Sequence, residues 1–396
     1  MEVQKIYDAK ERLKGHIKKT PLVKAANLGE DVYLKVEVLQ DTGSFKLRGA
    51  YNKIATLTPE EASKGVIACS AGNHAQGVAK SATERGIKSI ICMPLHAPIS
   101  KVEATKNYGA EVLLVPETFD DAAAKAQELV KEKGYTFIAP FNDEEVIAGQ
   151  GTIGLEILED LPDCDIVVVP IGGGGLISGV ALAVKSLRPS CKVIGVQTKA
   201  VPSMYESKKA GKITGVKGGS TIADGISVKV PGEITFGLVE KYVDEIVLVD
   251  ENEISSAILT LLEKNKIVTE GAGATPVAAL MYNKFEHEGK KVCCLLSGGN
   301  IDVTRIAKVI NKGLFKTKRS AEYKVILNDQ PGELSKLTRL FEENKANINQ
   351  IRQAPDTHAD AIDAMKVNVV VSTKDEEQQR QIEEDLRKHG YSFEKK

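Results

Sequence analysis

The stretch Ile166–Gln197, IVVVPIGGGGLISGVALAVKSLRPSCKVIGVQ, decides the fold class. It begins with an uninterrupted apolar run and ends with another, Lys192–Gln197, and such runs are typical of strands buried on both faces. Between them lie four glycines and the helix-periodic segment Leu176–Leu187. A strand, a helix and a second strand in this order predict a parallel βαβ unit.

The same alternation extends on both sides, from about residue 32 to residue 300. Further strand-like runs are Val32–Leu39, Val66–Cys69, Ser89–Met93, Glu111–Val115 and Lys291–Leu296. Further helical segments are His74–Arg85, Ser100–Tyr108, Phe119–Lys133 and Glu145–Leu161. We therefore predict an α/β region of parallel sheets covered by helices, whose ligands bind at the C-terminal ends of the strands.

The pattern changes after Asn311. The segment Gly313–Ser320, GLFKTKRS, is typical of a basic linker. The predicted elements beyond it are the strand Tyr323–Leu327, the helix Glu333–Glu343, the strands Ile348–Arg352 and Met365–Ser372, the helix Asp375–His389 and a strand near Tyr391–Phe393. This βαββαβ order predicts a ferredoxin-like domain. The predicted division is a catalytic region at 1–313, a linker at 314–320 and a C-terminal domain at 321–396.

Length, charge and cysteine usage narrow the class of function. The 396 residues carry a net charge of -1, which gives no overall field to attract nucleic acid or an anionic membrane. No apolar run approaches the ~20 residues that span a bilayer, and the N-terminal segment lacks the apolar core of a secretory signal. Six scattered cysteines without a C-x-x-C spacing are typical of a reduced, cytoplasmic protein. We expect its partner to be a small molecule.

The first candidate motif is DTGSFKLRGA, residues 41–50, in which a loop runs into a helical pattern at Lys46. A lysine held there behind Phe45 and near free helix amides would be partly desolvated. Desolvation lowers the pKa of an amine and lets it form a Schiff base. Taken alone, Lys46 is more simply interpreted as a solvated surface lysine.

The second motif is CSAGNHAQG, residues 69–77, directly after the strand Val66–Cys69. Ser70 and Asn73 are typical N-caps for the helix that follows, and small residues there let backbone amides approach a carboxylate. Ordinary helix capping explains the motif about as well. His74 has no second histidine or carboxylate at ligand spacing, so it predicts no metal site.

The third motif is the glycine run at residues 172–175, which lies between a strand and a helix. So many glycines cost chain entropy that a turn alone would not require, and they predict a nest of amides around a phosphate. A dinucleotide fingerprint would need an acidic residue after the next strand, which ends in Gln197 and Thr198. The Gly-Lys-Ser/Thr of a P-loop does not occur either. A single small phosphate is favoured, with a flexible turn as the alternative.

The fourth motif is LLSGGN, residues 295–300, where Ser297 follows another strand. Alone, Ser297 is a turn hydroxyl. Together the four motifs bring an amine, a carboxylate nest, a phosphate nest and a hydroxyl to the ends of parallel strands. Pyridoxal phosphate with an amino acid needs this set of groups.

The order GSFKLRGA, SAGNHAQG, GGGGL, SGGN resembles that of the threonine/serine dehydratases, in the tryptophan-synthase-β-like class of pyridoxal-phosphate enzymes. The resemblance covers about residues 5–313. It implies fold type II, with a smaller lobe at roughly 45–145 inserted in a larger one. It also implies pyridoxal 5'-phosphate as the cofactor and a homodimer or homotetramer.

The resemblance assigns roles to particular residues. Lys46 would hold the cofactor as a Schiff base and act as the base at the substrate Cα. The other cofactor contacts would be Phe45 at the ring, Asn73 at the ring 3'-oxygen, Gly172, Gly173, Gly174, Gly175 and Leu176 at the phosphate, and Ser297 at the ring nitrogen. The substrate carboxylate would lie against Ser70, Ala71, Gly72, Asn73 and His74.

The implied reaction is β-elimination and deamination of L-threonine to 2-oxobutanoate and ammonia, with L-serine to pyruvate as a secondary reaction. A neutral hydroxyl at Ser297 should not keep the ring nitrogen protonated, which favours elimination over transamination. The alternatives are another β-hydroxy amino acid lyase, a serine racemase, or an amino-acid sensor without catalysis. The retained Lys46 argues against the sensor.

Two departures help to choose among these. The related serine racemases carry a second serine where this chain has Ala71, whose methyl group cannot donate a proton. Metal-activated relatives place acidic ligands near the positions of Gln197 and Ser203, which are neutral here. We therefore predict a dehydratase without a divalent metal at that site.

The C-terminal sequence NDQPGEL, residues 328–334, resembles an ACT regulatory domain. Such domains pair across subunits and bind amino acids or other small effectors. Asn328, Asp329 and Gly332, on the turn before the helix Glu333–Glu343, are the expected effector contacts. A dimerisation module that binds nothing is the alternative.

Overall fold

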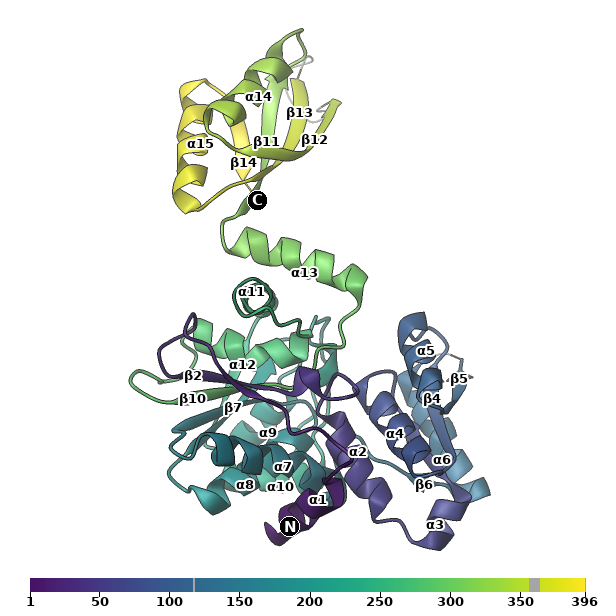
Figure 1. Ribbon diagram of the computed structural model, residues 1–396. Coiled ribbons are helices and arrows are strands. Elements are labelled where there is room, and N and C mark those ends of the chain that lie inside the picture. Colours follow the sequence, from purple (N-terminus) through teal and green to yellow (C-terminus); the bar gives the residue numbers. More distant parts are fainter. Residues whose placement is uncertain (117, 356–363, 396) are drawn as a thin grey trace. The chain divides into compact units, whose positions relative to one another are not determined.

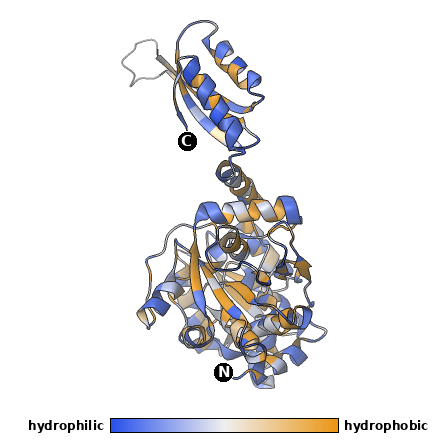
Figure 2. Ribbon diagram, turned by 90° about the vertical axis from the view of Figure 1, so that its left-hand side faces the viewer, coloured by the Kyte–Doolittle hydropathy of each residue, from blue (hydrophilic) through white to orange (hydrophobic). Residues whose placement is uncertain are grey.

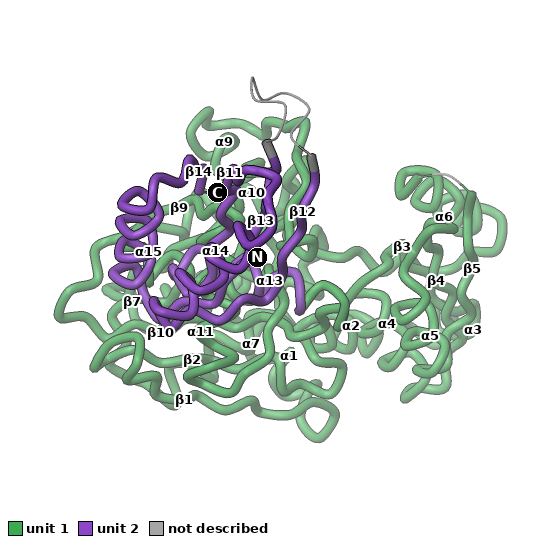
Figure 3. The backbone as a smooth tube through the Cα atoms, turned by 90° about the horizontal axis from the view of Figure 1, so that it is seen from above, with its two compact units in different colours: residues 1–306 green, residues 307–396 purple. Residues whose placement is uncertain are grey.

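The computed structural model describes residues 1–116, 118–355 and 364–395. They form two compact units, Met1–Ile306 and Ala307–Lys396, which Figure 3 colours separately. Unit 1 has two lobes, each built on its own sheet, and unit 2 contains a further four-stranded sheet (Figure 1). The predicted α/β class, with a ferredoxin-like C-terminal domain, is confirmed.

The larger lobe is built on a six-stranded sheet with the order β1-β2-β10-β7-β8-β9. The edge strand β1 is antiparallel to β2, and the other strands are parallel. Every residue of β7 and β10 is buried, which accounts for their continuous apolar character; Figure 2 shows the hydrophobic strands of this sheet between more polar helices. The strands are β1 Leu22–Lys24, β2 Val32–Val36, β7 Ile166–Pro170, β8 Lys192–Thr198, β9 Glu245–Val249 and β10 Val292–Leu296.

Helices cover both faces of this sheet, with α12 on one side and α7, α8 and α10 on the other (Figure 1). The helices of the larger lobe are α1 Gln4–Leu13, α2 Lys46–Ala55, α7 Glu144–Asp160, α8 Gly175–Leu187, α9 Ser203–Ala210, α10 Glu233–Tyr242, α11 Glu251–Thr260 and α12 Gly271–Met281. The strand predicted over Val32–Leu39 is too long. It ends at Val36, and Glu37–Leu39 form a short 3-10 helix because the Glu37 side chain turns inward to bind Arg48.

The smaller lobe is built on a parallel sheet with the order β5-β4-β3-β6. Its strands are β3 Val66–Cys69, β4 Ser89–Pro94, β5 Glu111–Val115 and β6 Thr136–Phe137. Its helices are α3 Pro59–Lys64, α4 Asn73–Glu84, α5 Ile99–Asn107 and α6 Phe119–Lys133. A core of buried apolar side chains from β3, α4 and β4 joins this sheet to its helices, and Ala50 and Ile54 of α2 pack into the same core. The short strand β6 was not predicted, because two residues are too few for an apolar pattern.

Unit 2 has the predicted βαββαβ order on an antiparallel sheet, β12-β13-β11-β14. Its elements are β11 Ser320–Asn328, α14 Glu333–Glu343, β12 Asn347–Pro355, β13 Ala364–Ser372, α15 Glu376–Lys388 and β14 Ser392–Lys395. The buried side chains Tyr323, Phe341 and Ile382 belong to its hydrophobic core.

One helix crosses the boundary between the two units along the chain. Helix α13 spans Val303–Lys316, and β11 begins at Ser320. The predicted linker at 314–320 therefore includes the last turn of that helix and the first residue of a strand, because the helix continues past Gly313 to Lys316. The compact units divide at Ile306, whereas the domain boundaries at 313 and 321 stay a prediction. Within the described ranges, no helix combines the length and the apolar character that crossing a membrane requires.

Candidate functional site

Three of the four motifs follow neighbouring strands of the larger sheet. Strands β2, β10 and β7 are adjacent and parallel, so their C-terminal ends share one edge. β2 is followed by the loop with Lys46, β10 by the loop with Ser297, and β7 by the glycine run. The backbone N–H of Phe45 donates to the carbonyl of Ser297 at 3.0 Å, and that of Gly299 donates to the carbonyl of Gly43 at 2.9 Å. The first and fourth motifs are thus hydrogen-bonded to each other.

Lys46 is the first residue of α2, and its ammonium donates a hydrogen bond to the carbonyl of Pro140 at 2.7 Å. Burial lowers the pKa of the Lys46 ammonium to about 8, although the Glu270 carboxylate opposes this shift. A lysine with such a pKa has a substantial unprotonated fraction near neutral pH. Lys46 can therefore act as a nucleophile or a base.

The second motif reaches from the smaller lobe to the larger one through Asn73. The N-cap of α4 is Gly72, and no side chain caps this helix, so the N-caps predicted from the sequence were wrong. The Ser70 hydroxyl accepts from the N–H of Gly72 at 3.2 Å. The Asn73 amide donates to both oxygens of Glu270, at 2.9 and 3.1 Å, and accepts from Asn300 at 2.8 Å. Asn73 is free for this contact because it does not cap its own helix.

Two neighbours in the motif pack into the smaller lobe. The His74 Nε2 lies 2.8 Å from the carbonyl of Ile138, and since a carbonyl can only accept, Nε2 carries the proton. Burial lowers the pKa of His74 to about 3, with a contribution from Lys46, so its ring is neutral. Ala71 packs against the core of the smaller lobe. A Cβ added at Gly72 would meet no atom within 4 Å, so there is open space beside the N-terminus of α4.

The glycine run is held tightly by the protein itself. A Cβ on Gly173 would lie 2.5 Å from the ring of Phe141, and one on Gly174 would lie 2.8 Å from Cβ of Thr235. The Thr235 hydroxyl donates to the carbonyl of Gly173 at 2.6 Å. Packing therefore explains part of the need for glycine, and the predicted phosphate site stays a prediction. The free amides at the N-terminus of α8, which begins at Gly175, are the part that can bind an anion.

Gly174→Ala should destabilise the protein and weaken binding of a phosphate-bearing ligand. Gly174 has φ +96°, a left-handed conformation that costs an alanine about 1–2 kcal/mol, and the added methyl group would also press on Thr235. Gly237→Ala is the matched control, because Gly237 lies in α10 with no atom within 4 Å of an added Cβ. Thermal unfolding should show a lower midpoint for Gly174→Ala and an unchanged or higher one for Gly237→Ala. Equal midpoints for the two variants would contradict this account of the loop.

The residues present fit a phosphorylated aldehyde cofactor. Lys46 offers an amine, α8 offers amides for a phosphate, and Ser297, only 2% exposed, lies one strand away from the glycine run. Three buried polar atoms in the motifs have no hydrogen-bond partner within the described part of the chain: Thr42 Oγ1, Ser44 Oγ and His74 Nδ1. Unpaired buried polar atoms are uncommon, and a bound ligand is one way to satisfy them.

A buried ionic cluster fixes the helix that carries Lys46. Arg48 lies two residues after Lys46, and its guanidinium contacts Glu37 at 2.8 Å and Glu156 at 2.6 Å. Lys35 binds the other oxygen of Glu156 at 2.5 Å. Burial would lower the pKa of Arg48, but the two carboxylates outweigh this and raise it. The side chains of Arg48, Glu37 and Lys35 are fully buried, so each charge depends on its partners.

Sequence reasoning missed several residues that shape this site. Glu270 and Asn300 bind Asn73, while Phe141 and Thr235 pack around the glycine run. Asn300 lies inside the quoted SGGN motif, and the glycine-rich TEGAGAT around Glu270 resembles the other motifs in composition. Phe141 and Thr235 lie in segments with no such signal.

Gln197 and Ser203, near which metal-activated relatives place acidic ligands, both make hydrogen bonds within the protein. The Gln197 amide accepts from the N–H of Tyr205 at 2.8 Å and donates to the carbonyl of Ile171 at 3.3 Å. The Ser203 hydroxyl donates to the carbonyl of Val228 at 2.6 Å. The expectation that no divalent metal binds there stays a prediction.

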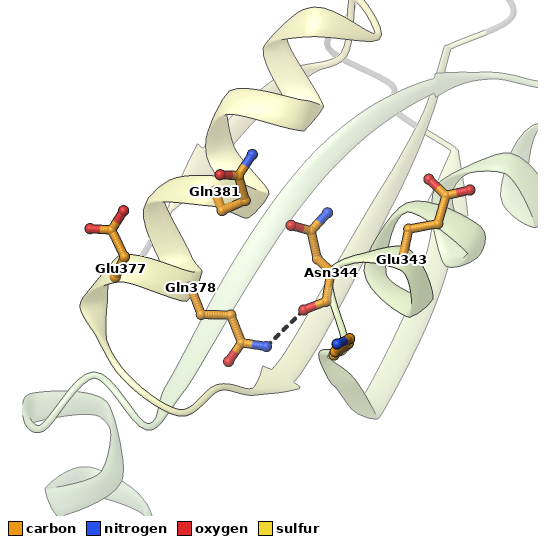
Figure 4. Close-up of a pocket in the computed structure, with 6 residues that line it drawn as sticks. Glu343, Asn344, Glu377, Gln378 and Gln381 are labelled. Atoms are coloured by element: carbon orange, nitrogen blue, oxygen red, sulfur yellow. Dashed lines mark hydrogen bonds between the residues drawn. The ribbon is translucent and has the colours of Figure 1, made fainter.

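In unit 2, the predicted effector residues Asn328, Asp329 and Gly332 are exposed: Asn328 ends β11, and the other two lie on the turn before α14. Gly332 has φ +95°, which explains a glycine at this N-cap. An open pocket lies at the opposite, C-terminal end of α14, where Gln378 donates to the carbonyl of Asn344 at 2.8 Å (Figure 4). The turn and the pocket are therefore separate places on this unit.

Comparison with known proteins agrees with this geometry. Residues 13–298 match the family model described as pyridoxal-phosphate dependent enzyme, and residues 324–390 match the ACT domain. The chain is 50% identical over 393 residues to the L-threonine ammonia-lyase of Thermotoga maritima, covering 98% of each chain. The structure of this protein is also similar to that of maize serine racemase, with a TM-score of 0.75 and 36% sequence identity. The similarity covers 79% of this chain and 98% of the maize chain.

A structure of processed threonine deaminase isoform 2 from Solanum lycopersicum is also similar, with a TM-score of 0.74 and 37% identity. That similarity covers 78% of this chain and 92% of the tomato chain. Since the family model spans well over half of the chain, and Lys46, the glycine run and Ser297 share one sheet edge, this protein belongs to the pyridoxal-phosphate dependent enzymes and carries a C-terminal ACT domain.

Proposed function

We propose that this protein is a threonine dehydratase that converts L-threonine to 2-oxobutanoate and ammonia, with L-serine to pyruvate as a secondary reaction. The observation that carries the proposal is the position of the Lys46 amine, which is partly buried and whose pKa desolvation lowers to about 8, at the sheet edge shared with Ser297 and the glycine run. It is supported by the relative from Thermotoga maritima, which is named L-threonine ammonia-lyase and matches over nearly the whole chain.

Binding would use residues from both lobes. Gly172, Gly173, Gly174, Gly175 and Leu176 would hold the phosphate of pyridoxal 5'-phosphate at the N-terminus of α8, where the helix dipole favours an anion. Phe45 would pack on the cofactor ring, Asn73 would bind the 3'-oxygen attached to that ring, and Ser297 would face the ring nitrogen. The substrate carboxylate would lie at the N-terminus of α4, against Ser70, Ala71, Gly72, Asn73 and His74. The open space beside Gly72 leaves room for it.

When bound, the cofactor supplies an aldehyde that links to an amine and a ring that withdraws electrons from the substrate Cα. Lys46 would hold the cofactor through its aldehyde carbon, and the free Lys46 amine would take the proton from Cα of the bound substrate. The α4 amides and the phosphate loop would fix the substrate beside that amine, which removes much of the entropic cost of proton transfer. Ser297, a neutral hydroxyl, would leave the ring nitrogen unprotonated and so favour loss of the β-hydroxyl.

A serine racemase is the second candidate, because maize serine racemase resembles the catalytic region closely. Ala71 distinguishes the two activities. Its methyl group packs against the core of the smaller lobe and cannot give a proton to the substrate. We therefore expect the protein to release 2-oxo acid from L-serine without forming D-serine.

The direct test is a substrate panel of L-threonine, L-serine, D-serine and 3-hydroxyaspartate, with 2-oxo acid release and chiral amino-acid analysis as readouts. We expect 2-oxobutanoate from L-threonine as the fastest product. A cofactor-loaded protein that is inert on threonine, or one that forms D-serine faster than pyruvate, would overturn the assignment.

Loading of the apo protein with pyridoxal phosphate should depend on pH through Lys46. An unprotonated amine attacks the aldehyde, and at pH 8 about half of Lys46 would be unprotonated, against less than about 1% of an ordinary lysine. The rate of loading, followed by absorbance at about 410–420 nm, should therefore rise with pH and level off above about pH 9. A rate that keeps rising towards pH 10.5 would show a lysine with an ordinary pKa.

We also propose a homodimer or homotetramer, and a small effector at Asn328, Asp329 and Gly332 on the ACT unit. Gly332, whose φ of +95° favours glycine, has no side chain at the start of α14, where an anionic group could meet backbone amides. Light scattering measures the subunit number. Activity assays with added amino acids, on wild type and Asp329→Ala, test the effector.

A further inference from the structure

Glu270 has a carboxylate that its own helix does not use. It is the N-cap residue of α12, yet its side chain makes no capping hydrogen bond. The carboxylate instead accepts from the Asn73 amide of the smaller lobe, at 2.9 and 3.1 Å. The residue is only 6% exposed. The Glu270 carboxylate binds an amide of the smaller lobe and not the N-terminus of its own helix. Helix capping therefore does not explain this side chain.

Glycines make room for this arrangement. A Cβ on Gly298 would lie 2.7 Å from Glu270 Oε1, and a Cβ on Gly43 would collide with Oδ1 of Asn300. Both glycines belong to the motifs that carry Ser297 and Lys46. The backbone N–H of Glu270 donates to the carbonyl of Gly298 at 3.0 Å, which ties the segment directly to the loop after β10.

The side-chain amides of Asn300 and Asn73 lie between two groups that can only accept hydrogen bonds, and these acceptors fix which way each amide is oriented. The carbonyl of Thr42 can only accept, so the Asn300 amide nitrogen faces it, at 2.7 Å. The same nitrogen donates to Oδ1 of Asn73 at 2.8 Å. The Asn73 nitrogen must then face Glu270, which as a carboxylate also only accepts.

One N–H of Asn73 remains free in this arrangement. The two oxygens of a carboxylate lie close together, whereas the two N–H bonds of an amide diverge widely. A single N–H is therefore shared between both Glu270 oxygens. Among the residues that the structure describes, none accepts the second N–H of Asn73, which leaves it available to an acceptor atom of a ligand.

We propose that Glu270 is a positioning residue. It holds the Asn73 amide so that the second N–H of Asn73 faces the 3'-oxygen on the cofactor ring. This inference rests on the proposed function, because it needs pyridoxal phosphate in the site. Asn300 supports the same orientation from the other side. Glu270 thus acts on the cofactor through Asn73 and need not touch it.

The charge state of Glu270 is compatible with this role. Burial raises the pKa of the Glu270 carboxyl to about 7, while the hydrogen bond from Asn73 lowers it. The charged groups that act on it are Asp224, which raises its pKa further, and Lys101 and Lys46, which lower it. Either state keeps an oxygen that accepts from Asn73, and the ionised state holds the amide more strongly.

A double-mutant cycle on the holoenzyme tests the proposal, with the dissociation constant of pyridoxal phosphate, measured by absorbance titration, as the readout. Glu270→Gln keeps an acceptor oxygen but removes the negative charge that strengthens the hydrogen bond from Asn73, so it should weaken cofactor binding about tenfold when Asn73 is present. It should change binding by less than about twofold when Asn73 has been replaced by alanine, because residues that act through one another are not additive. Glu253→Gln is the matched control: Glu253 is also a buried carboxylate near a helix N-terminus, but it pairs with Lys284 at 2.7 Å. It should leave cofactor binding unchanged.

An equal loss of affinity from Glu270→Gln in both backgrounds would overturn the proposal, as would no loss in either. If Glu270→Gln does not fold, Asn300→Ala takes its place in the cycle and should show the same dependence on Asn73. Failure of the wild type to bind pyridoxal phosphate at all would overturn the proposed function itself. Normal binding and threonine deamination without coupling would overturn only the role of Glu270.

Discussion

Replacing Lys46 with alanine should lower 2-oxobutanoate release from L-threonine by at least about 10²–10⁴-fold, because the variant lacks both the attachment point of the cofactor and the base at Cα. The fold should survive, since the Lys46 amine bonds to one carbonyl, that of Pro140. Product release by wild type and variant, each saturated with pyridoxal phosphate, measures the effect.

Lys53→Ala is the control on the same helix. Lys53 lies in the last turn of α2 and pairs with Asp143 at 2.7 Å on a partly exposed surface. Its loss should cost no more than about 1 kcal/mol of stability and leave turnover intact. Activity in Lys46→Ala close to that of Lys53→Ala would mean that another residue performs the chemistry.

Arg48→Met should destabilise the protein by about 3–5 kcal/mol, because it leaves Glu37 and Glu156 buried with an uncompensated charge. The Lys35 ammonium still pairs with Glu156. Glu37 is therefore the carboxylate that loses its ion pair. In thermal unfolding this loss corresponds to a midpoint lower by roughly 6–20 °C. Since α2 begins at Lys46, we also expect weaker cofactor binding.

The matched control for Arg48 is Arg12→Met. Arg12 pairs with Glu145 at 3.3 Å, and both side chains are partly exposed. A pair of this kind contributes about 0–1 kcal/mol. If the two methionine variants unfold at the same temperature, the buried cluster does not hold α2 as described.

The parts of the fold that were predictable from the sequence are those encoded by continuous patterns. Apolar runs such as Ile166–Pro170 marked the buried strands, and because parallel strands end at one edge, they also indicated that Lys46, the glycine run and Ser297 would lie near each other. The ACT unit was predictable for the same reason, since its elements alternate regularly.

The parts that were not predictable depend on contacts between distant segments. Local chemistry favoured Ser70 and Asn73 as N-caps, but Glu270 lies 197 residues further along the chain and binds Asn73 instead. The entropy cost of the glycine run indicated a ligand, while the packing of Phe141 and Thr235 against it became visible only in three dimensions. Likewise, β2 ends early because Glu37 pairs with a residue of α2.

Reduction of the holoenzyme with borohydride would make the carbon–nitrogen bond between the cofactor and its lysine permanent. Peptide mapping by mass spectrometry then identifies the lysine that carries the cofactor. We expect one modified site, at Lys46 in the sequence GSFKLRGA. A pyridoxyl group on any other lysine, or an unmodified Lys46 in yellow and active protein, would contradict this expectation.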